Sequence, residues 1–288
     1  FSELKDARMA VKRKEFDRAR KLLGGRLQPF LAAGEDVADD LAYALKIVIN
    51  SVYGLTSAKF PTPFKDNRNV DNIVAKRGAL FMVDLKHAVQ EKGFTVAHIK
   101  TDSIKIPDAT PEIIQFVMDF GQKYGYEFEH EGTYDKFCLV NDAVYIARQG
   151  DKWTAVGAQF QHPYVFKKLF THEEIEFDDL CETRSVQQGA MYLDFNESEL
   201  RKVTEFVHVG RTGSFVPVLN NGAFLWRIKE DKKYAVTGTK GYRWIEREMA
   251  EKREEPYGDF IDYSYFEKLA RDAEAAIEYY GPFHRFVS

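Results

Sequence analysis

The sequence predicts an α+β protein, in which helices and antiparallel strands occupy separate stretches of the chain. Three observations lead to this class. Apolar side chains recur at helical spacing in several segments, and short segments with alternating polar and apolar residues lie between them. One pair of alternating segments is joined by only two residues, which favours antiparallel pairing. The chain has 288 residues, 44% hydrophobic and 30% charged, so it can bury one large core or two to three small ones.

The first predicted elements are two helices that form a hairpin. Residues 3–23 carry apolar or small side chains at helical spacing, and Gly24 and Gly25 stand where a C-terminal cap would end the helix. A second helix is predicted over residues 37–53. The segment between them is short, so we expect the two helices to run antiparallel.

The middle of the chain predicts a helix, a β-hairpin and another helix. Turn-forming residues precede this block, and Gly93 ends its first helix. The two alternating segments pair as strands because only two residues separate them. In order, the predicted elements are a helix at 72–93, strands at 94–100 and 103–107 joined by Thr101 and Asp102, and a helix at 111–124 opened by Thr110 and Pro111.

The C-terminal half predicts mainly strands. Alternating segments at 137–148 and 153–160 extend the sheet region, and an acidic stretch beyond Pro163 begins a new region. Turn-rich segments with several glycines follow, and the last predicted element is a helix near 264–280. No internal repeat interrupts this order.

Charge is distributed unevenly along the chain. The net charge is −4, yet residues 1–30 carry nine Lys and Arg against four acidic residues, and the remainder is therefore strongly acidic. Such asymmetry predicts an anionic partner at one end of the molecule. The two cysteines, Cys138 and Cys181, lie far apart and form no zinc-binding pair, as expected for a protein of a reducing compartment. No apolar run approaches the length of a membrane span, so the sequence predicts a soluble, cytoplasmic protein without membrane contact.

Several polar residues of the predicted helical hairpin converge. Lys46, Asn50 and Tyr53 are spaced i, i+4 and i+7, which places them on one stripe of their helix. A turn in the middle of the connecting segment sets Arg8 opposite Asn50 and Lys12 opposite Lys46. This set suits a polyphosphate with a stacked base. For any one of these residues alone, a solvated helix face is the commoner role.

Four motifs in the same order resemble those of the family B DNA polymerases. KIVINSVYG, residues 46–54, fits the K-x-x-x-N-S-x-Y-G signature of that family without a mismatch, and Arg8 with Lys12 fits its R-x-x-x-K pair. HIKTDS, residues 98–103, stands where the family has Y-x-D-T-D-S, and AVY, residues 143–145, stands where it has K-x-Y. The C-terminal segments look most like the bacteriophage members.

The resemblance implies a fold and an activity. It implies an antiparallel helical hairpin as fingers at 1–56, the C-terminal half of an antiparallel-sheet palm with helices on one face at 57–165, and a mixed thumb at 166–288. It implies a DNA-templated DNA polymerase that adds deoxynucleotides to the 3′ end of a primer by two-metal phosphoryl transfer. The implied partners are primer-template DNA and a deoxynucleoside triphosphate.

The resemblance also implies roles for the residues of the hairpin. Arg8, Lys12 and Lys46 would bind the triphosphate of the incoming nucleotide, and Lys46 would also assist catalysis. Asn50 and Tyr53 would line the nascent base pair. These roles follow from the match of each position to the family motif.

By the same resemblance, Asp102 would be a catalytic residue and a ligand of Mg²⁺. Magnesium needs hard carboxylate oxygens, and two ions stabilise both the attacking and the leaving oxygen of an in-line displacement. Taken alone, an aspartate between two strands is more often an ordinary turn residue. The order of the motifs favours the catalytic role.

Two positions depart from the family motifs. Lys100 stands where the family has the first Asp of D-T-D-S, and Ala143 stands where it has the Lys of K-x-Y. Strand alternation would put Lys100 and Asp102 on one face. Lys100 could then supply the positive charge at the primer end that the family takes from the Lys of K-x-Y. The alternative is neutral drift. Tyr145 keeps the aromatic position of the second motif and is a predicted DNA contact.

Three basic residues in the glycine-rich turns of the last region complete the predicted DNA contacts. Arg211, Lys240 and Arg243 lie where backbone amides and cations could meet a duplex phosphate strand. Ordinary hairpins explain these turns equally well.

One required carboxylate is missing from the sequence. The family has another catalytic Asp in a D-x-x-S-L-Y-P motif upstream of the fingers, and this chain begins with Phe1 and lacks that motif. We therefore expect the chain alone to be inactive and to need the N-terminal exonuclease and palm part of the same polymerase. The alternatives are a noncatalytic primer-template-binding subunit, an inactivated polymerase, or an α+β interaction module in which the motif is coincidental.

Overall fold

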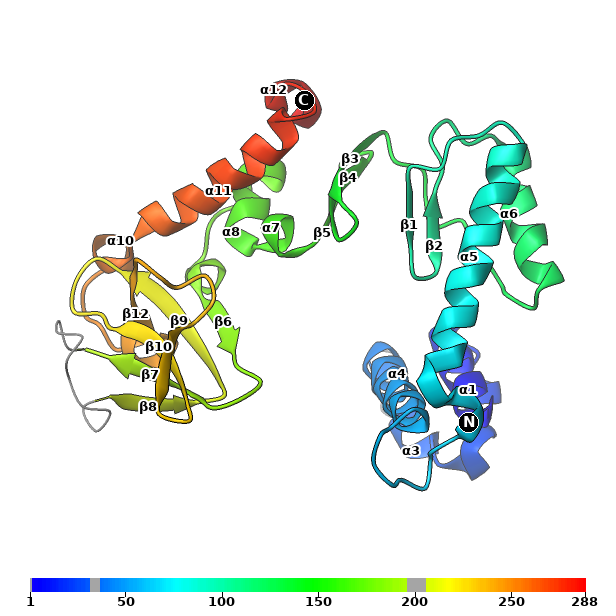
Figure 1. Ribbon diagram of the computed structural model, residues 1–288, viewed down its shortest axis with the longest axis horizontal. Helices are drawn as coiled ribbons and strands as arrows, with labels where there is room; N and C mark the ends of the chain where they lie inside the picture. The colour runs from blue at the N-terminus through cyan, green and yellow to red at the C-terminus, as the bar shows by residue number, and fades with distance from the viewer. Residues whose placement is uncertain (1, 32–36, 196–205) are drawn as a thin grey trace. The chain divides into compact units, whose positions relative to one another are not determined.

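The computed structural model describes residues 2–31, 37–195 and 206–288. These residues form two compact units, Phe1–Phe128 and Glu129–Ser288. Each unit combines helices with antiparallel strands, so the predicted α+β class is confirmed (Figure 1). The predicted boundaries after residues 56 and 165 differ from the observed boundary after residue 128, and the division into three parts stays a prediction.

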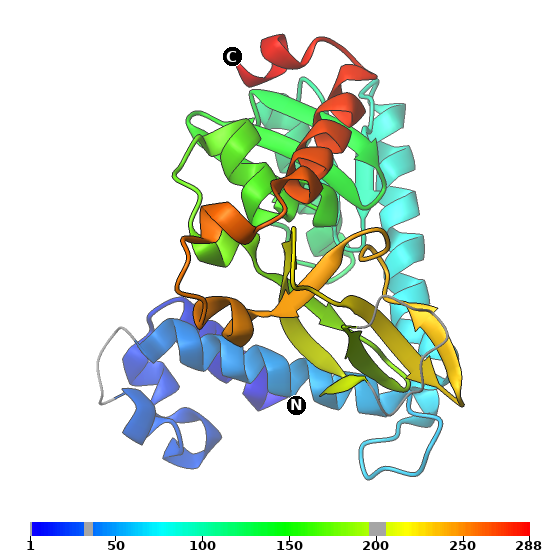
Figure 2. The same ribbon diagram turned by 90° about the vertical axis from the view of Figure 1, so that its left-hand side faces the viewer.

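The first unit begins with a pair of long helices. Helix α1 spans Ser2–Lys12 and helix α4 spans Val37–Thr56. They pack along each other and run in opposite directions (Figure 2). Between them the described chain forms three single turns, α2 at Phe16–Ala19, η1 at Leu22–Gly25 and α3 at Gln28–Leu31. The predicted second helix is therefore confirmed.

The predicted single helix over residues 3–23 is wrong, because α1 ends at Lys12. The chain turns there through Lys14, whose φ of 58° is left-handed. A straight helix would have carried the apolar residues after Lys14 away from α4. After the break, Phe16 and Leu23 pack instead on the cluster that α1 and α4 share. Burial of these side chains outweighs the local preference for a continuous helix.

Small side chains form the contact between the two long helices. Ala7, Ala10 and Val11 of α1 and Ala38 of α4 are almost completely buried, and Leu45 of α4 is 7% exposed. Because alanine has only a methyl group, the two backbones can approach closely. The contact therefore fixes which face of each helix is hidden.

The rest of the first unit follows the predicted order of elements. Thr110 caps α6, its side chain accepting a hydrogen bond from the backbone N–H of Ile113. Gly93, with a φ of 87°, follows the end of α5. The elements are η2 at Asn67–Asn72, α5 at Ile73–Glu91, β1 at His98–Lys100, β2 at Ser103–Lys105 and α6 at Pro111–Lys123.

The β1–β2 hairpin lies on the two helices of this part. Ile99 pairs with Ile104, and both pack against a cluster that contains Phe81, Leu85 and Ile113. Alternation along a strand places the neighbouring residues of the hairpin on the face away from this cluster. One face of the hairpin is therefore covered by helices.

The second unit begins with a three-stranded antiparallel meander. Its strands are β3 at Lys136–Asn141, β4 at Val144–Gln149 and β5 at Lys152–Val156. The strand predicted over 153–160 is thus too long, because the chain turns at Gly157 into a short helix. Gly157 has a φ of 90°, and a Cβ there would lie 2.7 Å from the carbonyl oxygen of Ala143. Only glycine fits this turn.

Two further antiparallel sheets and several helices complete the second unit. One sheet has the order β11-β10-β7-β8 and the other has the order β12-β9-β6. The strands are β6 at Glu182–Ser185, β7 at Ala190–Asp194, β8 at Val207–Gly210, β9 at Thr212–Val218, β10 at Phe224–Lys229, β11 at Lys232–Ala235 and β12 at Arg243–Glu246. The helices are α7 at Ala158–Gln161, α8 at Pro163–Phe166, η3 at Lys167–Thr171, η4 at Phe177–Leu180, α9 at Arg247–Glu251, α10 at Tyr257–Phe260, α11 at Tyr263–Glu278 and α12 at Phe283–Val287. The predicted helix near 264–280 is confirmed as α11.

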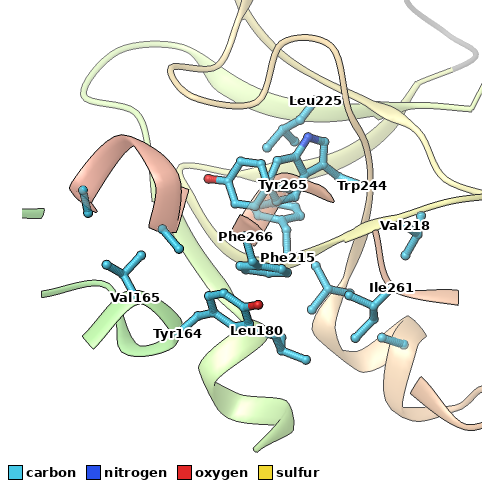
Figure 3. Close-up of a cluster of buried hydrophobic side chains, with 14 of the residues drawn as sticks. Tyr164, Val165, Leu180, Phe215, Val218, Leu225, Trp244, Ile261, Tyr265 and Phe266 are labelled. Atoms are coloured by element: carbon cyan, nitrogen blue, oxygen red, sulfur yellow. The ribbon is translucent and has the colours of Figure 1, made fainter. Parts of the chain in front are cut away.

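A single hydrophobic cluster joins the elements of the second unit. Trp244 and Phe215 from the sheets meet Phe266 from α11 at its centre (Figure 3). Cys138 of β3 and Ile146 of β4 belong to the same cluster. The meander therefore shares its core with the C-terminal elements of the chain.

A buried ionic network lies beside this core. The Glu182 carboxylate accepts a hydrogen bond from Nε2 of His162 at 2.8 Å and pairs with the Arg184 guanidinium at 2.9 Å. Arg184 also donates to the Tyr265 hydroxyl at 2.8 Å. Burial alone would raise the pKa of Glu182, but the hydrogen bond from His162 and the charge of Arg184 hold it below its ordinary value. The network ties β6 to α8 and α11.

Glu182→Ala should lower the free energy of unfolding of the second unit by roughly 3 kcal/mol, because it leaves buried polar groups without their counter-charge. All three tryptophans lie in this unit, so their fluorescence during urea unfolding measures the change. The ionised carboxylate stabilises the fold, and its contribution is full above its unfolded pKa and fades as the pH falls through the folded pKa. The difference between Glu182→Ala and wild type should therefore shrink in acid. Glu254→Gln, at an exposed carboxylate, should change stability little.

Candidate nucleotide-binding site

Helix α4 presents its three motif residues beside its buried face. Leu45 points into the contact with α1, whereas Lys46 and Asn50 are exposed and Tyr53 is half-buried. At about 100° per residue, Lys46 and Asn50 lie roughly 100° and 140° from Leu45 around the helix, and Tyr53 lies about 80° from it. The three residues therefore form one stripe that borders the helix contact on one side.

Helix α1 presents its two motif residues in the same way. Arg8 and Lys12 lie about 100° and 140° around the helix from Ala7, which is fully buried in the contact. In two antiparallel helices of the same hand, residues displaced by the same rotation from the contact lie on the same side of the pair. Arg8 and Lys12 therefore border the contact on the side where Lys46 and Asn50 lie.

The cations of this side have no acidic partner among the residues that the structure describes. The Nε of Arg8 is buried and makes no hydrogen bond there, while Lys12 and Lys46 are exposed. A buried guanidinium N–H without an acceptor is costly unless a ligand supplies one. The arrangement suits an anion with several oxygen atoms, such as a chain of phosphates.

Asp102 lies at the tip of the β1–β2 hairpin. Lys100 pairs with Ser103, and the turn between them consists of Thr101, with a left-handed φ of 46°, and Asp102. The backbone N–H of Asp102 donates to the Lys100 carbonyl oxygen at 2.6 Å, and the carboxylate side chain is exposed. The expectation that strand alternation places Lys100 and Asp102 on one face does not hold, because the strand ends at Lys100.

The donor set around Asp102 is too small for a complete metal site. Among the described residues, no three His, Cys, Asp or Glu side chains are grouped so that they could hold a metal ion. Asp102 alone offers a hard oxygen ligand of the kind that Mg²⁺ prefers. The magnesium role of Asp102 therefore stays a prediction, and it requires further ligands.

The predicted DNA contacts in the second unit have different surroundings. Tyr145 is 9% exposed and packs against Phe137 in a tilted arrangement with ring centres 5.1 Å apart. Burial, more than the nearby Tyr134 and Glu131, raises the pKa of its hydroxyl. This side chain serves first as a packing residue of the meander. Lys100 and Ala143 lie in different units, so their proposed exchange of charge stays a hypothesis.

The three predicted basic contacts of the last region also differ from one another. Arg211 and Lys240 are exposed, whereas Arg243 is half-buried. Its guanidinium lies 4.5 Å from the ring centre of Phe224 and donates to the Gly222 carbonyl oxygen at 3.4 Å. The contact between Arg243 and the Phe224 ring was not predicted from the sequence. Phe224 and Trp226 alternate with other residues along β10, and this pattern could have predicted a ring on the strand face near Arg243.

Comparison with known proteins finds similarity among solved structures. No family model matches the sequence, and no curated protein matches it. Among solved structures, the chain is similar to the family B DNA polymerase from the hyperthermophilic archaeon Pyrobaculum calidifontis, with 15% sequence identity and a TM-score of 0.42. The match covers 96% of this chain and 37% of that polymerase chain. The chain thus spans little more than a third of the polymerase's length.

The helices give no sign of a membrane span. Among those that the structure describes, none combines the length and the apolar character needed to cross a bilayer.

Truncation of two neighbouring residues of α4 should change stability by very different amounts. Leu45→Ala should lower the stability of the α1–α4 pair by about 2 to 4 kcal/mol, because it removes buried methyl groups and leaves a cavity. Lys46→Ala should change it by less than about 0.5 kcal/mol, because Lys46 is exposed. Amide hydrogen exchange in α1 and α4 measures both effects. Equal loss of protection in the two variants would contradict the assigned faces.

Proposed function

We propose that this chain is the fingers, the C-terminal half of the palm and the thumb of a family B DNA polymerase of the bacteriophage type, acting in the cytoplasm. The observation that carries the proposal is the position of one motif. K-x-x-x-N-S-x-Y-G lies on α4, and its Lys46, Asn50 and Tyr53 border the contact with α1 on the side of Arg8 and Lys12. The proposed parts are residues 1–56, 57–165 and 166–288.

The chemistry of this side supports a nucleoside triphosphate as the ligand. Arg8, Lys12 and Lys46 would bind the phosphates, because guanidinium and ammonium groups form charge-assisted hydrogen bonds with phosphate oxygens. Asn50 and Tyr53 would line the nascent base pair, since an amide and a phenol offer hydrogen bonds next to apolar surface. Such positioning is the main protein contribution to phosphoryl transfer.

The proposed role of Asp102 is that of one magnesium ligand. Its exposed position at a hairpin tip leaves the carboxylate open to an ion and a substrate. A two-ion site needs further carboxylates, which we assign to the upstream palm part of the same polymerase, the part that also carries the exonuclease.

The proposed contacts with primer-template DNA lie in both units. Lys100 and Tyr145 would meet the primer end, and Arg211, Lys240 and Arg243 would meet phosphates of the duplex. Each cation that neutralises a phosphate adds affinity that depends on salt rather than on sequence.

A second candidate is a noncatalytic subunit that binds primer-template junctions. Lys100 favours it, because a lysine stands where the family motif has an acidic residue two positions before Asp102. The two candidates share the nucleotide site and differ in whether the complete protein extends a primer.

Lys46→Ala in the complete polymerase should raise the KM for nucleotide and slow the chemical step, because a charge-assisted phosphate contact tightens in the transition state. We expect a loss in kcat/KM of at least about tenfold. Single-turnover primer extension at several nucleotide concentrations measures both constants. Lys59→Ala, which removes an exposed lysine outside the motif, is the control. Unchanged nucleotide kinetics in Lys46→Ala would remove the main support for the proposal.

Asp102→Asn in the complete polymerase should abolish extension, because the amide cannot replace a charged magnesium ligand. DNA binding should survive, since phosphate contacts elsewhere supply most of the affinity. Gel-based extension and fluorescence anisotropy with the same primer-template measure the two properties. If wild type binds the junction more tightly with the correct nucleotide and yet extends nothing, the noncatalytic candidate is the better one.

A further inference from the structure

The sheet β11-β10-β7-β8 has one face in the core and one face outside it. Met191, Leu193 and Leu225 point into the hydrophobic core and are at most 2% exposed. Alternation turns Tyr192 and Trp226 to the other side. This second face does not belong to the buried hydrophobic cluster.

Rings run across the outer side of three neighbouring strands. Trp226 of β10 pairs with Tyr192 of β7, and Tyr192 pairs with His208 of β8. The rings of Tyr192 and His208 have centres 5.1 Å apart. Phe224 lies 6.3 Å from Trp226, and Phe206 lies 6.4 Å from Tyr192. We call these five residues with Lys233 the aromatic face.

None of these five residues is fully buried. His208 is exposed, and Tyr192, Phe206, Phe224 and Trp226 are half-buried. Five ring side chains gathered outside the core of one sheet form a surface that can stack against a flat ligand.

Two cations lie over these rings. The Nζ of Lys233 lies 4.1 Å from the ring centre of Trp226, and the guanidinium of Arg243 lies 4.5 Å from that of Phe224. Asp194 is the acidic residue among the strand-paired positions of this face, and it is 2% exposed and 3.4 Å from Lys233. The Asp194 carboxylate is thus buried, and among the described residues the Lys233 ammonium forms no second ion pair, so it can contact a further acceptor.

We propose that the aromatic face binds single-stranded nucleic acid. Unpaired bases would stack on Tyr192, Trp226 and their ring neighbours, and phosphates would contact Lys233 and Arg243. Aromatic side chains interleaved with cations are the combination that binds single strands without sequence preference. A duplex hides the faces of its bases, so it could use only the cations.

This inference does not depend on the proposed nucleotide-binding site, although both proposals assign Arg243 to phosphate contact. The aromatic face lies entirely within the second unit, whereas the nucleotide-binding side of α1 and α4 lies in the first unit. Binding to a single strand needs neither a nucleotide nor a primer end.

The test measures binding of the full chain to a fluorescein-labelled oligothymidylate of about 12 nucleotides and to a duplex of the same length, by anisotropy. Tyr192→Leu and Trp226→Leu should each weaken single-strand binding by roughly 5- to 150-fold, the range equivalent to one stacked base. Trp226→Phe keeps a ring and should keep most of the affinity, while it removes the quenching of tryptophan fluorescence by the bound strand.

The matched control is Tyr234→Leu. Tyr234 is 42% exposed on the same sheet, but it pairs with Arg227 and therefore lies on the opposite side of β11 from Lys233. This variant should bind the single strand as wild type does. Circular dichroism confirms that each variant is folded, and Trp226→Phe remains informative if Trp226→Leu unfolds.

Three results would overturn the inference. Equal affinity for single strand and duplex, with no effect of Tyr192→Leu, would leave only phosphate contact. Self-association of the chain that Tyr192→Leu abolishes would identify a second copy as the occupant. Unquenched fluorescence in wild type at saturating oligothymidylate would exclude stacking on Trp226. Absence of primer extension by the complete polymerase, with single-strand binding by this chain intact, would instead count against the proposed function alone.

Discussion

The packing of α1 against α4 through small side chains is the contact on which the candidate site depends. Ala7 and Ala10 let the two backbones approach, and Leu45 fixes the rotation of α4. Once these faces are buried, Arg8 and Lys46 must lie on the same side of the helix pair, because their helices are right-handed and run in opposite directions. The positions of the long, flexible cations of the candidate site are thus set by the small buried side chains that pack between α1 and α4.

Sequence reasoning succeeded where the signal is local. The cap at Thr110, the two-residue turn after Lys100 and the spacing within α4 each depend on residues close in the chain. Prediction from the sequence was wrong where contacts between residues far apart in the chain determine the local structure. The break after Lys12 arises because Phe16 packs on the contact between α1 and α4, and the meander joins the C-terminal elements because Ile146 packs into their core.

The candidate site shows the same limit at the level of side chains. The spacing of Lys46 and Asn50 on one helix sufficed to predict that they share a stripe. Tyr145 and Arg243 are predicted DNA contacts by residue type, and the structure shows in addition that they pack on Phe137 and Phe224. The sequence shows the chemical groups of a residue, whereas the fold determines which other side chains those groups contact.

The return of the chain after α1 has a consequence for how the molecule meets a polyanion. Glu3 accepts a hydrogen bond from the backbone N–H of Leu23 at 2.7 Å, so residue 23 lies beside the first turn of α1. The nine cations of residues 1–30 are therefore gathered around a helix of 11 residues, about 16 Å long, rather than spread along a rod twice that length. Charge concentrated within one or two Debye lengths attracts a polyanion before contact, and it makes the rate of encounter fall steeply with ionic strength.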